Sequence, residues 1–190
     1  MKNDFFDLDL FEEDSPMSVD HLDERSIFIL GEIDDGIYNT AIIPIMKMNE
    51  KEKNFKTHEP IKLYISSEGG MLYHALALID VMRNSEIPVH TYCMGWAASA
   101  AFMILCAGHK RFAYKNASLM LHEASWGFNT DKVTTLKSNV KEIENIEKRM
   151  IDLFKEHTCI TEGMYKENGS KEWWMDTQEA LKLRVIDEIL

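Results

Sequence analysis

Cysteine is scarce in this sequence, with three residues among 190, and no two of them form a Cys-x-x-Cys pair. Cys93 and Cys106 lie in strongly apolar runs, where a reduced, buried thiol is the usual state. This pattern disfavours a disulfide framework and a cysteine zinc site. The histidines have no metal-ligand spacing either, so the sequence predicts no metal ion and no cofactor.

Basic residues are also in deficit, because 21 Lys and Arg stand against 32 Asp and Glu and the formal net charge is −11. Such an acidic chain is a poor ligand for nucleic acid or for an anionic membrane. No apolar run reaches the roughly 20 residues that span a bilayer. Residues 1–14 contain no basic-then-apolar signal pattern. We therefore expect a cytoplasmic protein with no nucleic-acid partner and no membrane partner.

Short apolar runs that alternate with helical patterns are present along most of the chain. The runs Ile61–Ile65 and Val89–Met94 are typical of buried strands, and each precedes glycine and then a helix-like segment. This alternation indicates βαβ crossovers and a largely parallel sheet in an α/β fold. The length fits one domain, which we place at residues 18–190, after a flexible acidic arm at residues 1–17. Pro44 falls inside one helical pattern and is expected to kink or interrupt it.

One serine lies where a strand is expected to turn into a helix. The stretch Gly95-Trp96-Ala97-Ala98-Ser99-Ala100 leads from an apolar run into a helical run that ends near Cys106. A serine at such a turn, near the positive end of a helix, is well placed to act as a nucleophile. The alternative is that these small residues only allow tight packing at the turn.

Two further stretches accompany Ser99 in the sequence. Ile65-Ser66-Ser67-Glu68-Gly69-Gly70 lies upstream and Ser118-Leu119-Met120-Leu121-His122 lies downstream. Together the three stretches resemble the caseinolytic protease proteolytic subunit (ClpP) family of self-compartmentalising serine peptidases, from about Glu24 to the C-terminus. The resemblance implies a ClpP/crotonase-like α/β fold, a spiral of repeated ββα units with a protruding long handle helix.

By this resemblance, Ser99 is the nucleophile and His122 is the general base. A serine hydroxyl needs a base within hydrogen-bond reach, and the base needs an acceptor that fixes its tautomer. Aligning Trp174-Met175 with the family motif places Glu172 where the family has an aspartate. Asp176 is the rival acid, although its position suits a helix cap.

The resemblance also assigns the groups around the nucleophile. The backbone N–H groups of Gly70 and Ala100 would form the oxyanion hole. Glu68 replaces the proline that usually precedes the glycine pair, so Glu68 and Gly69 would lie beside the substrate. Glu123 follows the histidine where the family has Gln-Pro, and would also line the substrate.

Apolar residues recur at helical spacing near the C-terminal third of the chain, at Val133, Leu136, Val140, Ile143, Ile146, Met150 and Leu153. The pattern predicts a long amphipathic helix over about residues 130–157. Periodicity alone equally allows a helix that packs along the core. In the family the matching element is the handle helix, which interlocks two stacked rings, each heptameric.

The leading prediction is a serine endopeptidase subunit of a ring-shaped homo-oligomer that hydrolyses short or unfolded polypeptides. An ATP-dependent AAA+ unfoldase would be the partner that uses ATP, because this chain has no Gly-x-x-x-x-Gly-Lys-Ser/Thr loop. The family docks unfoldases in an aromatic-rich pocket, and the matching positions here hold Tyr64 but also Lys62 and Asn84.

Two alternatives come from other functional classes. The first is a catalytically weak or inactive structural ring subunit, which Glu68 and Glu172 favour because they depart from the family pattern. The second is a crotonase-type acyl-CoA enzyme, which the pairing of Ser99 with His122 disfavours.

Overall fold

The computed structural model describes residues 24–190 except 126 and 128–131, so the arm predicted at residues 1–17 lies outside the described residues. In order, the elements are β1 (Ser26–Ile33), the π-helix η1 (Tyr38–Ile42), α1 (Ile43–Glu52), β2 (Ile61–Gly70), α2 (Leu72–Arg83), β3 (Val89–Ala98), α3 (Ala100–Cys106), β4 (Lys110–Ala113), β5 (Ser118–Leu121), α4 (Val133–His157), α5 (Glu162–Asn168), β6 (Trp173–Met175), α6 (Thr177–Lys182) and β7 (Glu188–Ile189).

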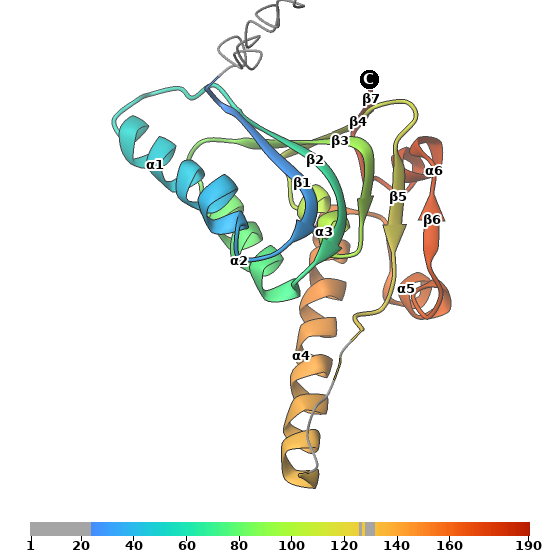
Figure 1. Ribbon diagram of the computed structural model, residues 1–190. Coiled ribbons are helices and arrows are strands. Elements are labelled where there is room, and N and C mark those ends of the chain that lie inside the picture. Colours follow the sequence, from blue (N-terminus) through green and yellow to red (C-terminus); the bar gives the residue numbers. More distant parts are fainter. Residues whose placement is uncertain (1–23, 126, 128–131) are drawn as a thin grey trace, which may run out of the picture.

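The strands of the described chain form one sheet with the order β1-β2-β3-β4-β7, which β5 joins through β3 (Figure 1). β6 pairs antiparallel with β5, whereas the other pairs are parallel. The sheet branches along β3, because residues 90–93 pair with β4 and residues 96–98 pair with β5. Gly95 lies between the two halves with a φ of 73°. The predicted α/β fold with a largely parallel sheet is confirmed.

β2 extends beyond the apolar run that predicted it. It was expected to end at Ile65 before a glycine turn, but it continues through Gly70, and Ile33 of β1 pairs with that residue. The two strands approach so closely there that a Cβ on Gly70 would lie 2.4 Å from the carbonyl oxygen of Ile33. The absence of a side chain at Gly70 therefore allows the two strands to pair closely. The polar residues before the glycines gave no apolar pattern that would predict this part of the strand.

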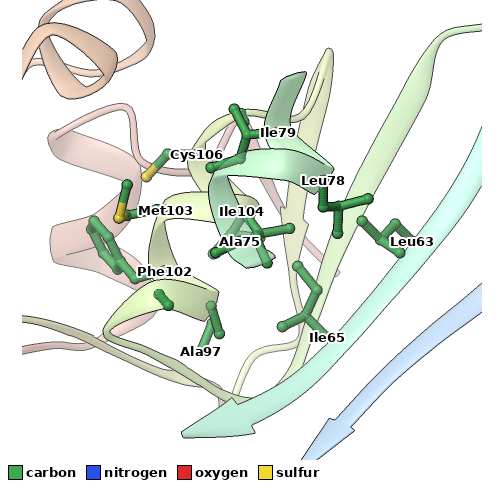
Figure 2. Close-up of a cluster of buried hydrophobic side chains, with 14 of the residues drawn as sticks. Leu63, Ile65, Ala75, Leu78, Ile79, Ala97, Phe102, Met103, Ile104 and Cys106 are labelled. Carbon is green, nitrogen blue, oxygen red and sulfur yellow. The ribbon is translucent and has the colours of Figure 1, made fainter. Parts of the chain in front are cut away.

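The core lies between the sheet and helices α2 and α3. Figure 2 shows Leu63 and Ile65 of β2 facing the side chains of these two helices. All seven residues of α3 are buried, as expected of a helix that is apolar on every side. Burial of each large aliphatic side chain stabilises the fold by about 1.5–3 kcal/mol. Because α3 begins directly after Ser99, this core fixes the position of the serine.

α4 projects away from the body of the protein (Figure 1). Its C-terminal half packs on the core through Ile146, Met150, Leu153 and Phe154. Its N-terminal half exposes Val133, Leu136 and Val140. The helix occupies the segment where the apolar spacing predicts one. No helix in the described ranges is long and apolar enough to cross a membrane.

The chain stays helical through Pro44, so the expected interruption is wrong: η1 continues directly into α1, and Ile42 and Ile43 at the junction both have right-handed helical φ and ψ. The π-helix η1 ends at Ile42, and Pro44 lies in the first turn of α1. Proline has no N–H to donate, and the adjoining π-helical turn, in which the N–H of Ile43 donates to the carbonyl of Tyr38, changes the hydrogen-bond pattern just before it.

Candidate active site

Ser99 occupies a sharp turn between β3 and α3. Its φ of 55° and ψ of −120° are unusual for a residue with a side chain, and such strain costs about 1–3 kcal/mol. Two backbone hydrogen bonds hold the turn. The Ser99 N–H donates to the carbonyl of Met120 at 2.9 Å, and the Ser99 carbonyl accepts from the N–H of Met103 at 3.3 Å. The serine side chain is thereby fixed at the edge of the sheet.

His122 follows directly after β5, the strand that lies beside the end of β3. Ala98 pairs with Met120 in this parallel contact, so the residues after both strands emerge together. The Nε2 atom of His122 lies 2.7 Å from Oγ of Ser99. A neutral imidazole can accept the hydroxyl proton of the serine at this distance.

A small cavity of about 60 Å³ adjoins this pair. Its lining contains both predicted oxyanion donors, Gly70 and Ala100, together with Ser99 and His122. Gly69 lies behind the turn, where a Cβ would be 2.7 Å from the carbonyl oxygen of Ala98 and 2.8 Å from Cβ of Ser99. Only a glycine allows β2 to approach the serine so closely.

The two candidate acids lie in different surroundings. The carboxylate of Glu172 accepts a hydrogen bond from Nε1 of Trp174 at 3.1 Å. Asp176 is the N-cap of α6, where its side chain accepts from the N–H of Glu179 at 2.8 Å. In the described part of the chain neither acid is hydrogen-bonded to His122.

The register of β5 and β6 bears on Glu172, because both strands end one residue short of the two side chains in question. β5 and β6 pair Met120 with Trp174 and Leu121 with Trp173. Continued by one step, the same register would place Glu172 opposite His122. Residues directly opposite each other in an antiparallel pair share one face of the sheet, with Cβ atoms about 4.5–5.5 Å apart.

The other predicted substrate-lining residues lie outside the cavity. Glu68 and Glu123 are both exposed. The N–H of Glu123 donates to the carbonyl of Gly169 at 2.7 Å. Burial raises the pKa of Glu147 on α4, and the carboxylate of Glu123 raises it further, so these two acids lie near each other.

Three apolar residues that line the cavity were not predicted, namely Leu72, Met103 and Met150. Met103 is four residues after Ser99, one helical turn away, so its direction could have been read from the helical spacing. Met150 belongs to the apolar stripe of α4, but the sequence did not show which part of that stripe meets the nucleophile. Ala124 and Ser125 complete the lining.

A second surface feature lies on the outer face of the sheet. Phe28, Tyr64, Tyr92 and Phe112 come from four adjacent strands and stack in a row. Successive ring centroids lie 5.0, 4.9 and 4.6 Å apart. The amino group of Lys110 lies 4.6 Å from the centre of the Phe112 ring, a cation–π contact.

A serine at a strained strand-to-helix turn, with a histidine at 2.7 Å on the neighbouring strand, is an arrangement typical of hydrolases built on an α/β sheet. Comparison with known protein families identifies the particular group. The family model for Clp protease matches residues 13–190. The chain belongs to the Clp protease family, a family of peptidases, as the sequence motifs predict.

Proposed function

We propose that this protein is a serine endopeptidase that cleaves short or unfolded polypeptides inside a ring-shaped homo-oligomer. The observation that carries the proposal is the 2.7 Å distance between Oγ of Ser99 and Nε2 of His122. The backbone of Gly70 and Ala100 in the same cavity supports it, because peptide hydrolysis needs N–H donors beside the nucleophile.

In this mechanism Oγ of Ser99 attacks the peptide carbonyl carbon while Nε2 of His122 takes the hydroxyl proton. The N–H groups of Gly70 and Ala100 donate to the resulting oxyanion, each contributing about 3 kcal/mol to the transition state. The C–N bond then breaks and His122 gives its proton to the leaving amine. Water attacks the acyl ester by the same route, with His122 again as base, and Ser99 is regenerated.

Glu172 is the third member of the triad in this proposal. The register of β5 and β6 supports it, because one more pair after Leu121 and Trp173 would join His122 and Glu172. The Asp176 carboxylate accepts a hydrogen bond from the N–H of Glu179 and so caps α6. A carboxylate opposite His122 would hold the imidazole in the required tautomer and stabilise the imidazolium.

The proposed assembly consists of two stacked rings, heptameric as in the family, that are joined through α4. Support comes from Val133, Leu136 and Val140, which are exposed on the projecting half of that helix and would be covered by a second copy. Enclosure would protect folded proteins from the nucleophile, because only short or unfolded chains could enter.

An AAA+ unfoldase is the proposed partner at the outer face of the sheet. The stacked row of Phe28, Tyr64, Tyr92 and Phe112 offers an aromatic surface for an apolar loop. Lys62 lies on the same face, because it alternates with buried Ile61 and Leu63 in β2. The docking loop would therefore combine an apolar side chain with an acidic one.

A structural ring subunit with little activity is the second candidate function. The observation that favours it is that the Glu172 carboxylate accepts a hydrogen bond from Trp174 and none from His122. In that case the assembled chain would hydrolyse no peptide, with or without an unfoldase.

Hydrolysis of a fluorogenic peptide and of an unfolded protein tests the proposal. The assembled wild-type chain should cleave both, and Ser99→Ala should cleave neither. Ser138→Ala, at an exposed serine on α4, is the matched control and should retain the wild-type rate. Retained hydrolysis in Ser99→Ala would overturn the serine mechanism, and an inactive wild type would favour the structural subunit.

A further inference from the structure

The Glu172 side chain is exposed and one methylene longer than an aspartate, so it has an additional rotatable bond. A catalytic acid that rotates freely in solvent would rarely present an oxygen to the histidine. Fixing such a side chain costs conformational entropy, up to about 1.5–2 kcal/mol for glutamate. If Glu172 is the third triad member, another group has to orient it.

Trp174 contacts this carboxylate. Its indole Nε1–H donates to Oε2 of Glu172 at 3.1 Å. Glu172 directly precedes β6 and Trp174 is its second residue, so the two side chains are two positions apart along the extended chain and share one face of the sheet. A carboxylate has two oxygens and about four acceptor sites, so Oε1 can still accept from an imidazole N–H. In the described part of the chain, Oε1 has no hydrogen-bond partner and Glu172 has no ion pair.

The indole of Trp174 is itself held by Trp96. The two rings are nearly parallel, with an interplanar angle of 3° and centroids 6.5 Å apart. Trp96 belongs to β3, three residues before Ser99, whereas Trp174 belongs to β6. β5, which carries His122 at its end, lies between these two strands (Figure 1). The stack thus spans β5 and connects the strand of the nucleophile to the strand of the acid.

We propose that Trp174 is a positioning residue for the acid, and that its indole N–H holds Oε2 of Glu172 so that Oε1 faces Nδ1 of His122. This inference rests on the proposed function and extends it to a residue that does not touch the substrate. It explains how a glutamate can occupy the position of a shorter acid, because the indole fixes the additional rotatable bond. Phenylalanine at this position would preserve the ring stack and remove the hydrogen bond.

Trp174→Phe and Trp96→Phe form a matched pair for the test. Both substitutions keep an aromatic ring in the stack, but only Trp174 donates a hydrogen bond to Glu172 among the described residues. Trp174→Phe should lower kcat for a peptide about tenfold and leave KM unchanged, since a hydrogen bond to a charged group of this strength is lost. Trp96→Phe should retain a kcat within about twofold of wild type, and both variants should unfold at similar temperatures.

A double-variant cycle separates positioning from structural damage. In a Glu172→Gln background the carboxylate is gone, so Trp174→Phe should lower kcat no further. An equal tenfold loss in both backgrounds would overturn the inference, because a structural effect would persist without the acid. A higher kcat in Trp174→Phe would also overturn it, since the indole would then be drawing Glu172 away from His122. If the wild type shows no Ser99-dependent hydrolysis, the proposed function itself fails. If the wild type hydrolyses peptide but the cycle shows equal losses, only the positioning role of Trp174 fails.

Discussion

The backbone N–H of Ser99 donates to the carbonyl of Met120 at 2.9 Å, two residues before His122. This bond ties the turn that carries the nucleophile to the strand that carries the base. Ser99 and His122 are 23 positions apart in the sequence, with α3, β4 and β5 between them, yet the side chains meet because β3 and β5 are parallel neighbours. The geometry of the pair is therefore a property of the sheet.

The identity of the third triad member is tested by comparing Glu172→Gln with Asp176→Asn. Glu172→Gln should lower kcat by about 100-fold or more, because the imidazolium loses its charged acceptor. Asp176→Asn should retain a rate within about twofold of wild type, since asparagine caps a helix as well as aspartate does. Steady-state peptide hydrolysis measures both, and the reverse ranking would assign the role to Asp176.

The close approach of β2 to the nucleophile turn is tested with Gly69→Ala. The new Cβ would lie 2.7–2.8 Å from atoms of Ala98 and Ser99, and the φ of 98° adds strain. We expect loss of hydrolysis together with a destabilisation of at least about 2 kcal/mol in denaturant unfolding.

Gly31→Ala is the matched control for that substitution. Its φ is 74°, but no atom lies within 4 Å of the added Cβ, so only backbone strain of about 1–2 kcal/mol is expected. Hydrolysis should continue in Gly31→Ala. Equal losses of activity in the two variants would show that the contact at Gly69 is unimportant.

The exposed stripe of α4 is tested by Val140→Asp, with Ser138→Asp as control. Val140 is 44% exposed in the single chain and belongs to the apolar face, whereas Ser138 lies off that face. A buried, unpaired carboxylate at an interface is costly, so Val140→Asp should convert the proposed double ring into smaller species in sedimentation. Ser138→Asp should sediment as wild type. Unchanged sedimentation of Val140→Asp would mean that this stripe does not join the rings.

Asp187 and Arg111 form an ion pair that predicts a pH dependence of stability. Arg111 is buried and donates from Nε and Nη2 to the two carboxylate oxygens at 2.9 and 2.5 Å. Burial acts to raise the pKa of Asp187, but the hydrogen bonds and charge of Arg111 outweigh it and hold that pKa below its ordinary value of 3.8. Asp187→Asn should cost about 2 kcal/mol of unfolding free energy at pH 7, allowing for the partial exposure of the carboxylate.

The lowered pKa fixes the sign of this dependence. The stabilisation is fully present above the unfolded value of 3.8 and is lost as the pH falls through the lower folded value. In denaturant unfolding, the difference in unfolding free energy between wild type and Asp187→Asn should therefore disappear below about pH 4. The neighbouring exposed pair of Lys110 and Glu188 is the control, and Glu188→Gln should change stability by less than about 1 kcal/mol. A difference in unfolding free energy that stays constant with pH would contradict a stabilising ion pair between Asp187 and Arg111.

Much of the fold could be read from the sequence, because apolar runs and helical spacing report burial directly. The run Ile61–Ile65 predicted β2, and the stripe from Val133 to Leu153 predicted α4. The extension of β2 to Gly70 was missed, because strand pairing there depends on a contact with Ile33 that is distant in sequence. Asp176 was recognised as a helix cap from its local pattern.

The site was predictable where its residues lie in short motifs. Ser99, His122 and the backbone of Gly70 and Ala100 come from three such stretches, and the structure brings them around one cavity. The orientation of Glu172 was not predictable, because its carboxylate is hydrogen-bonded to Trp174, whose ring stacks on that of Trp96 across β5. Contacts of this kind follow from strand register, which a single sequence does not specify.

Intact mass after exposure to a fluorophosphonate is the most direct test of the central claim that Ser99 is an activated nucleophile. The reagent phosphonylates a serine whose hydroxyl proton a base removes. We expect one adduct per wild-type chain and none in Ser99→Ala or His122→Ala. A well-folded, assembled wild-type chain that gains no adduct, or an adduct that persists in Ser99→Ala, would contradict it.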